Sequence, residues 1–314
     1  MHTHMNGNIL KKNGSPASYG NDDMFDGKHI SPQAVEPIMN RYGIRTFAGF
    51  IHPRSWLFFI ALLAGTQQVA GLEHSVGRMT AKDVFEDASL RRIAEAACRG
   101  DAETVNLYAS SGVNPNGSGL EGLTPLAWAV SCDSVEGVQA LLKVGADPNQ
   151  AIGDEFSSVV YIAAGRSDPG PLKALLEAGA EANVFDLKSE RTGLTQALSR
   201  GIEADDWRHW ELLLEKADIN RPMDKFGGTI ATYAASFNQF ERVVQLLEKG
   251  YSYRLRQLGR YVEVSEGRGE PFATWQKKAI QILNNRGVVF PVGPIAPELL
   301  SEVELQRLPP RYQE

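Results

Sequence analysis

A glycine-rich stretch is the first candidate for a chemical site. Gly117-Ser118-Gly119-Leu120-Glu121-Gly122 has the glycine spacing of a dinucleotide-binding loop. Such a loop needs a strand before it and a helix that opens on its third glycine. Here the stretch lies between Asn116 and Thr124, where a turn is expected, so the glycines of a tight hairpin explain it better. We therefore expect no bound cofactor.

Metal-binding and nucleophilic residues are sparse. Beyond residue 71 the histidines are His74 and His209, and the chain has two cysteines, Cys98 and Cys132. A zinc site needs about four such ligands at short spacings, and these residues do not supply them. No nucleophile is paired with a base in the sequence either. We expect no metal site and no enzymatic activity.

Three carboxylates precede a tryptophan in an apparent insertion. Glu203, Asp205 and Asp206 could suggest acid–base chemistry, but such a run more often begins a solvated helix. We interpret Asp205 as the cap of a helix that starts near Trp207. Trp207 and His209 do not fall clearly on the apolar face of that helix, so we predict that they contact a partner.

The composition describes an ordinary soluble globular protein. Of 314 residues, 43% are hydrophobic and 22% charged, and 32 basic against 38 acidic side chains give a net charge of −6. A nucleic-acid-binding protein would need a basic face to neutralise phosphates. We therefore expect no nucleic-acid partner.

A repeat of about 33 residues organises most of the chain. Asn116, Asn149, Asn183 and Asn220 are 33, 34 and 37 residues apart. A pair of leucines precedes each of four successive turns: Leu141-Leu142, Leu175-Leu176, Leu213-Leu214 and Leu246-Leu247. The offset is constant if the fourth copy has lost one residue at its turn. Repeats at such a period indicate stacked modules that share a core.

The best copy resembles the ankyrin-repeat family. It reads Gly122-Leu123-Thr124-Pro125-Leu126-Ala127-Trp128-Ala129 and continues through residues 138–149. Thr124 can cap a first helix, Pro125 suits its first position, and Gly145 suits a left-handed residue after the second helix. The resemblance covers residues 88–290 and implies an all-α ankyrin-repeat solenoid. Its five to six helix-turn-helix repeats would carry short hairpin fingers.

The remaining copies and the ends depart from this pattern. Ser158, Thr192 and Thr229 keep a possible cap but lose the proline. Residues 80–99 read as an N-terminal helical unit, and residues 275–283 as the outer helix of an incomplete sixth repeat. We interpret residues 255–269 as a modified finger. The repeat domain then covers 72–290, followed by a C-terminal tail at 291–314.

An apolar run upstream predicts export. Residues 56–64 are nine apolar residues behind Arg41, Arg45 and Arg54, and small residues follow at 69–71. The run is too short to span a membrane but fits a secretory signal, with a buried core helix as the alternative. We predict a signal peptide at 39–71, with 1–38 a disordered extension or a misassigned start. The product would be periplasmic, with no stable membrane anchor after cleavage.

The two cysteines could pair in an oxidising compartment. By the repeat alignment they lie one residue out of register on adjacent inner helices, whose axes should be about 8–10 Å apart. A disulfide usually requires Cα atoms within about 7 Å. We therefore predict two buried thiols, with a Cys98–Cys132 disulfide as the alternative.

The fingers are the predicted partner-binding surface, because they are free of core packing. Together with the two residues of the insertion, the predicted site residues are Glu121, Asp154, Glu155, Phe156, Phe185, Asp186, Lys188, Glu190, Arg191, Trp207, His209, Asp224, Lys225 and Phe226. Aromatic anchors among opposed charges suit a protein partner. The excess of carboxylates predicts a basic patch on that partner.

Export combined with ankyrin repeats resembles the immunity proteins that neutralise type VI secretion effectors, notably phospholipases that act in the periplasm. That resemblance implies occlusion of a cognate toxin. Two alternatives stay open. One is a periplasmic scaffold or helper for an antioxidant enzyme such as catalase, and the other is a secreted effector that engages host proteins.

Overall fold

The computed structural model describes residues 75–76, 79–153, 158–186, 191–223, 227–265, 269–293 and 295. All of them belong to one unit, Pro53–Glu314. The predicted extension at 1–38, the signal peptide at 39–71 and most of the tail lie outside the described residues. Those assignments stay predictions. Within the described residues, no helix combines the length and apolar character needed to cross a membrane.

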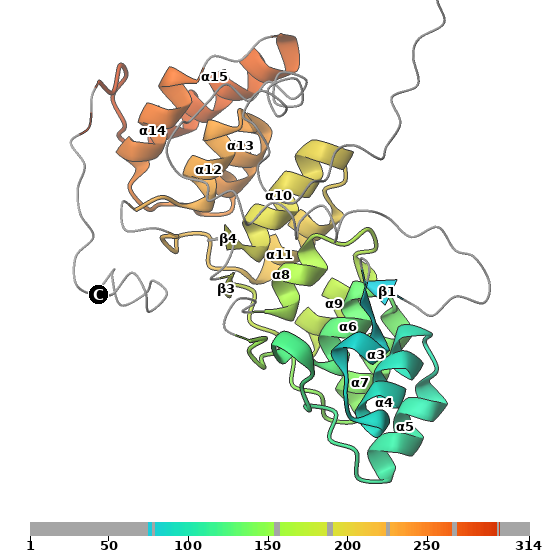
Figure 1. The fold of residues 1–314 in the computed structure, drawn as a ribbon. Helices are drawn as coiled ribbons and strands as arrows, with labels where there is room; N and C mark the ends of the chain where they lie inside the picture. The colour runs from blue at the N-terminus through green and yellow to red at the C-terminus, as the bar shows by residue number, and fades with distance from the viewer. Residues whose placement is uncertain are drawn as a thin grey trace, which may run out of the picture. The chain divides into compact units, whose positions relative to one another are not determined.

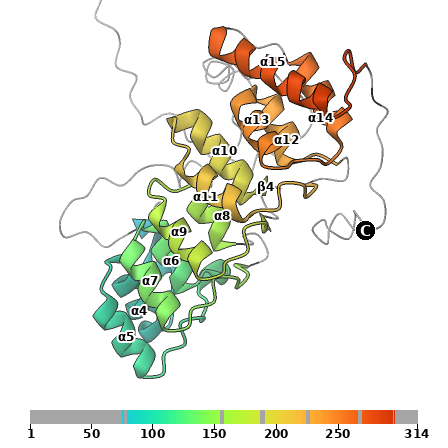
Figure 2. The same cartoon turned by 180° about the vertical axis from the view of Figure 1, so that it is seen from behind.

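The described residues form six successive pairs of helices, whose order can be followed in Figures 1 and 2. We call the first helix of each pair inner; these are α4 (Ala88–Cys98), α6 (Pro125–Ser131), α8 (Val159–Ala164), α10 (Gly193–Ala204), α12 (Ile230–Ser236) and α14 (Leu255–Val264). The outer helices are α5 (Ala102–Ser110), α7 (Val135–Lys143), α9 (Gly170–Glu177), α11 (Arg208–Lys216), α13 (Phe240–Glu248) and α15 (Glu270–Asn285). Each inner helix contacts the next inner helix, which confirms the predicted all-α ankyrin-repeat fold.

Short elements complete the stack. The strands β1 (Ser75–Val76) and β2 (Met79–Thr80) pair antiparallel and lead into α3 (Ala81–Val84). A second antiparallel pair, β3 (Phe185–Asp186) and β4 (Arg191–Thr192), forms the finger before α10. A 3₁₀ turn, η1 (Leu120–Gly122), lies in the finger before α6.

Hydroxyl side chains start four inner helices, as the sequence predicted. Thr124 Oγ1 accepts a hydrogen bond from Ala127 N at 3.1 Å, and Pro125 occupies the first helical position. Ser158 caps α8. Thr192 and Thr229 cap α10 and α12. Each cap satisfies an amide that has no partner inside its helix, which fixes where the helix begins.

The leucine pairs form the shared core between repeats. Seven of the eight leucines are buried, and Leu142 is partly buried against the same core. After the second helix of the best copy, Gly145 takes φ 94°, the left-handed conformation expected there. The core is thus continuous from repeat to repeat, as stacking requires.

The structure of residues 255–265 differs from the predicted finger. Residues 255–269 were expected to form a modified finger, but residues 255–264 are α14, the inner helix of a complete sixth repeat. Leu258 and Val262 on this helix are fully buried, and α14 contacts both α12 and α15. A Cβ on Gly259 would come within 2.9 Å of the Val288 side chain. This glycine therefore permits close packing of a helix.

Asp205 is a second correction. It was expected to cap the helix after the insertion, but it ends α10 in a left-handed conformation, with φ 52°. The next helix, α11, begins at Arg208, whose backbone N–H donates to Asp206 Oδ1 at 3.3 Å. The carboxylate at the start of this helix is therefore that of Asp206.

Candidate partner-binding surface

Asparagines at the repeat ends hold each finger to the next. Asn116 Nδ2 donates to Gly145 O at 2.9 Å, and Asp147 N donates to Asn116 Oδ1 at 2.7 Å. Asn149 and Asn183 make equivalent pairs of bonds one and two repeats further on. The spacing of asparagines seen in the sequence is therefore a chain of bridges that fixes the positions of the fingers.

Only part of the predicted site lies within the described residues. Glu121, Phe185, Asp186, Arg191, Trp207 and His209 can be placed. The other predicted residues lie outside the described residues: Asp154, Glu155, Phe156, Lys188, Glu190, Asp224, Lys225 and Phe226.

The glycine-rich stretch is a hairpin finger. Gly119 N donates to Leu123 O at 2.8 Å, and Gly122 N donates to Gly119 O at 3.1 Å. A Cβ on Gly122, which has φ 72°, would collide with the backbone of Gly153 in the next finger. The glycines thus serve the turn and the contact between fingers, and Glu121 is left exposed at the tip.

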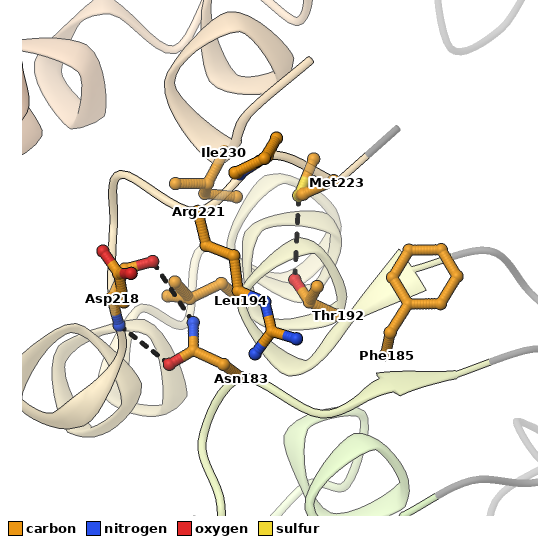
Figure 3. Close-up of a pocket in the computed structure, with 9 residues that line it drawn as sticks. Asn183, Phe185, Thr192, Leu194, Asp218, Arg221, Met223 and Ile230 are labelled. Atoms are coloured by element: carbon orange, nitrogen blue, oxygen red, sulfur yellow. Dashed lines mark hydrogen bonds between the residues drawn. The ribbon is translucent and has the colours of Figure 1, made fainter. Parts of the chain in front are cut away.

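Phe185 is not a free finger side chain. It was predicted to be available to a partner, but its ring is buried at the edge of a small hollow (Figure 3). The hollow measures about 350 Å³, including the space open to solvent. Its lining residues are Asn183, Phe185, Thr192, Leu194, Asp218, Arg221, Pro222, Met223 and Ile230. Arg191, paired with Asp186 across β3 and β4, is partly exposed beside it.

Trp207 is half-buried and holds two outer helices together. Its Nε1 donates to Asp205 Oδ1 at 3.2 Å. The guanidinium of Arg242 on α13 lies 4.3 Å from its ring centroid, and the ring of Trp210 meets it edge-on at 6.4 Å. These contacts give Trp207 a packing role, where the sequence suggested a contact site.

His209 was predicted to lie at the surface and contact a partner. Its side chain is fully buried in the structure. Its Nε2 lies 3.3 Å from Asp168 O, and Nδ1 has no hydrogen-bond partner. Burial lowers the pKa of His209, and the nearby positive charge of Arg200 lowers it further. The imidazole is therefore neutral at pH 7 and inaccessible to a partner.

The acidic cluster is an ion-pair site. Arg208 Nη2 lies 2.8 Å from Asp206 Oδ2, and Arg200 Nη2 lies 3.1 Å from the same oxygen. Hydrogen bonds from Arg208, chiefly, hold the pKa of Asp206 far below its usual range. A carboxyl group that stays ionised in this way cannot shuttle protons near neutral pH, so its role is structural.

Polar side chains link α11 to α13. Trp210 Nε1 donates to Gln245 Oε1 at 2.8 Å, and Gln245 Nε2 donates to Glu211 Oε2 at 2.8 Å. Arg242 Nη1 also reaches Glu211, at 3.3 Å. No motif marks such a link, because its members are 31 to 35 residues apart and are brought together by the stack.

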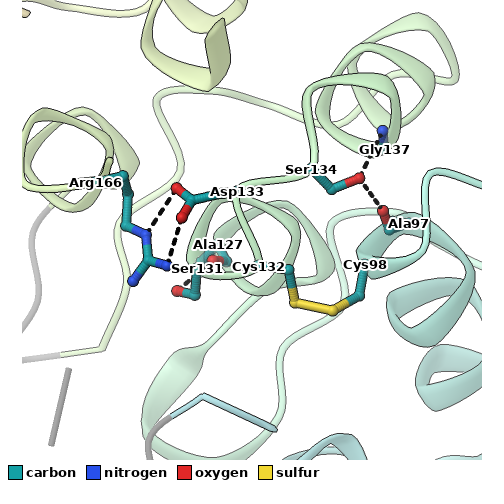
Figure 4. The surroundings of a disulfide bond; sticks show 9 residues. All are labelled: Ala97, Cys98, Ala127, Ser131, Cys132, Asp133, Ser134, Gly137 and Arg166. Carbon is teal, nitrogen blue, oxygen red and sulfur yellow. Dashed lines mark hydrogen bonds and ion pairs between the residues drawn. A yellow bond between two sulfur atoms is a disulfide. The ribbon is translucent and has the colours of Figure 1, made fainter. Parts of the chain in front are cut away.

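A disulfide joins Cys98 to Cys132, where the sequence analysis favoured two thiols (Figure 4). Their Cα atoms are 5.4 Å apart, closer than the general helix spacing suggested. Gly137 explains the approach, because a Cβ there would collide with the carbonyl oxygen of Ala97. Ser134 Oγ donates to that same oxygen at 2.7 Å. The first two repeats are therefore locked together.

Beside the disulfide, an arginine joins the second and third repeats. Arg166 donates to both carboxylate oxygens of Asp133, at 3.0 and 2.8 Å. Asp133 lies just beyond the C-cap of α6, with φ 55°. In the described part of the chain, no group of three or more histidine, cysteine, aspartate or glutamate side chains is placed to hold a metal ion.

Comparisons with known proteins found a matching family model, a curated relative and a similar solved structure. Residues 121–152 match the model of the ankyrin repeat. Protein PhlB from Serratia liquefaciens is 34% identical over 119 residues, which are 38% of this chain and 52% of PhlB. The chain thus matches about half the length of that curated relative. The ankyrin repeat domain of human ASB11 aligns with 70% of this chain and 92% of its own, at 20% identity and a TM-score of 0.45.

The matched repeat and the helix pairs of the described residues define an all-α ankyrin-repeat domain. Such a stack is a protein-binding module, because it presents side chains from many repeats that the shared core does not use.

Proposed function

We propose that this chain is an exported binding module that neutralises a toxin acting in the periplasm, such as a phospholipase delivered by type VI secretion. The observation that carries the proposal is the Cys98–Cys132 disulfide. Disulfides persist in the periplasm and outside the cell and are rare in the cytosol. The predicted signal peptide at 39–71 points to the same compartment.

Rigid fingers suit tight capture. The asparagine bridges hold neighbouring fingers in place before a partner arrives, so little conformational entropy is lost on binding. Neutralising a toxin calls for nanomolar affinity, about −12 kcal/mol, which an interface of about 1,600 Å² with good anchors can supply. The module would act by covering the active site or the membrane-facing surface of the toxin.

Charge gives the module a preference among partners. Exposed carboxylates lie along the described fingers, at Glu121, Asp147 and Glu181. They favour a partner with a basic patch, and association should slow as salt screens the attraction.

Co-expression tests the proposal. A candidate phospholipase toxin is directed to the periplasm of cells that make the full chain, and survival is counted. We expect protection by the full chain and none by a matched variant that lacks 39–71, because it would stay in the cytosol. Equal killing with and without the full chain would exclude immunity to that toxin.

A further inference from the structure

Exposed apolar side chains gather on the last two inner helices. Phe237, at the end of α12, is 42% exposed, and Tyr261 and Val264 on α14 are 39% and 49% exposed. The ring of Tyr233 lies 4.9 Å from that of Phe237. We call Tyr233, Phe237, Tyr261 and Val264 the α12–α14 surface.

One hydroxyl holds the two helices of this surface in place. The single hydroxyl proton of Ser265 is shared between two carbonyl oxygens, Ala235 O on α12 at 3.2 Å and Tyr261 O on α14 at 2.7 Å from Oγ. The C-terminal ends of the two helices are therefore fixed side by side. The aromatic side chains that they carry form a preorganised surface, which lowers the cost of binding.

The second repeat shows how this part of an inner helix is covered. Trp128 and Tyr233 are equivalent, since each lies four residues after a capping threonine, Thr124 or Thr229. Trp128 is only 1% exposed, and the ring of Phe85 meets it edge-on at 6.0 Å.

The covering residue comes from an acidic segment. Phe85 follows α3, and Glu86 and Asp87 follow Phe85 directly. At the second repeat, Trp128 is therefore covered by an aromatic side chain of the same protein that two acidic residues follow in the sequence. In the fifth repeat Phe237 stays exposed beside Tyr233.

The charge around the α12–α14 surface favours the same kind of occupant. Along α14 the charged side chains are those of Arg256, Arg260 and Glu263, so basic groups outnumber acidic ones on this helix. Arg256 is exposed, and Arg260 lies one helical turn before Val264. Glu263 pairs with Arg260 at 2.9 Å and accepts from Val292 N at 3.1 Å, so Arg256 is the exposed cation of α14.

We propose that the α12–α14 surface receives a segment of the partner protein that presents an aromatic side chain next to carboxylates. This assignment rests on the proposed function for the existence of a protein partner. The aromatic ring packs against Tyr233 and Phe237, much as Phe85 packs against Trp128. The carboxylates lie beside the exposed Arg256.

A peptide selection tests the proposal without knowledge of the partner. A library of short random peptides displayed on phage is selected against the purified full chain, and enriched peptides are synthesised for fluorescence anisotropy. We expect enriched sequences with Phe, Tyr or Trp within two residues of Asp or Glu. Phe237→Ser and Tyr261→Ser should each weaken binding about tenfold, since each removes a packed ring.

Matched variants distinguish binding at the α12–α14 surface from nonspecific binding elsewhere on the protein. Arg256→Gln should weaken binding several-fold and reduce its salt dependence. Leu107→Ser removes a side chain on α5 that is 65% exposed, outside the α12–α14 surface, and should leave binding unchanged. Thermal melting of every variant checks that the fold is retained.

Three outcomes would overturn the proposal: no enriched peptide, enriched peptides without the aromatic–acidic pair, or binding that survives Phe237→Ser. A dimer that Phe237→Ser abolishes would identify the occupant as a second copy of this chain, and would overturn the partner assignment too. Protection from a toxin that persists in Phe237→Ser would leave the proposed function standing without this surface. Peptide binding by a chain that protects against no toxin would support the α12–α14 surface and leave the proposed function without support.

Discussion

Asn183 and Asp218 exchange two hydrogen bonds across a repeat boundary. Asn183 Nδ2 donates to Asp218 O at 3.2 Å, and Asp218 N donates to Asn183 Oδ1 at 2.8 Å (Figure 3). At the preceding boundary Asn149 bonds to two residues, Gly179 and Glu181. The fourth copy is one residue shorter at its turn. There, Asp218 alone provides both the carbonyl oxygen that accepts from Asn183 and the amide that donates to it. The asparagine bridge is therefore kept although the fourth copy lacks the glycine that the other copies have at this turn.

Replacing Asn183 with alanine tests the strength of this bridge. Two hydrogen bonds of about 0.5–1.5 kcal/mol each are lost at an exposed site, so we expect Asn183→Ala to lower the free energy of unfolding by about 1–2 kcal/mol. Asn183→Asp keeps the acceptor and should lose about half as much. Urea denaturation measures both. Asn284→Ala, on the exposed end of α15, is the matched control and should change stability by less than about 0.5 kcal/mol.

The disulfide should contribute more to the free energy of unfolding than the hydrogen bonds of any single asparagine. It closes a segment with a sequence separation of 34, for which loss of entropy in the unfolded chain predicts a stabilisation of about 4 kcal/mol. We expect Cys98→Ser with Cys132→Ser to lower the urea midpoint accordingly.

Reductant provides the control for that experiment. It should destabilise the wild-type chain and leave the double serine variant unchanged. Thiol titration of the unfolded, unreduced chain should find no free cysteine. Two titratable thiols in protein purified from the periplasm would contradict the prediction.

Local sequence patterns predicted the features whose causes are local. Thr124 and Thr229 start helices because a hydroxyl can satisfy a free amide three residues on. Gly145 follows its helix because a left-handed residue is needed there. The leucine pairs are buried because stacked repeats must share a core. For these features, the residue type and its spacing carry the physical cause.

Features that depend on contacts between repeats were not predictable in the same way. The distance between Cys98 and Cys132 depends on the close approach at Gly137, which the general spacing of helices does not include. Phe185 and His209 read as surface residues, yet the neighbouring repeats bury both. For the predicted finger residues outside the described part of the chain, the binding role stays a prediction.

His209 makes stability depend on pH. Burial lowers its pKa in the folded protein below the value of about 6.5 expected in the unfolded chain. The unfolded chain therefore binds a proton that the folded protein does not. Stability is full above about pH 6.5 and falls as the pH drops below it, by at most about 1.4 kcal/mol per pH unit.

Several groups face this imidazole. Arg200 and Arg208 oppose its protonation, whereas Asp206 and the carbonyl of Asp168 favour it. Asp206 stays ionised through the pH range of this experiment, because its own pKa is strongly lowered. Urea midpoints between pH 8 and pH 5 should fall less steeply for His209→Gln than for the wild type. An NMR titration midpoint of the His209 ring at or above 6.5 would refute the explanation.

Gly201 and Trp207 should act as one unit. A Cβ on Gly201 would collide with the ring of Trp207, so Gly201→Ala must displace the ring from Arg242. We expect each of Gly201→Ala and Trp207→Ala to cost about 1–3 kcal/mol in the free energy of unfolding. Since both disrupt the same contact, the double variant should cost clearly less than the sum. Glu203→Ala, exposed on the same helix, is the control, and additive losses would show that the two residues act independently.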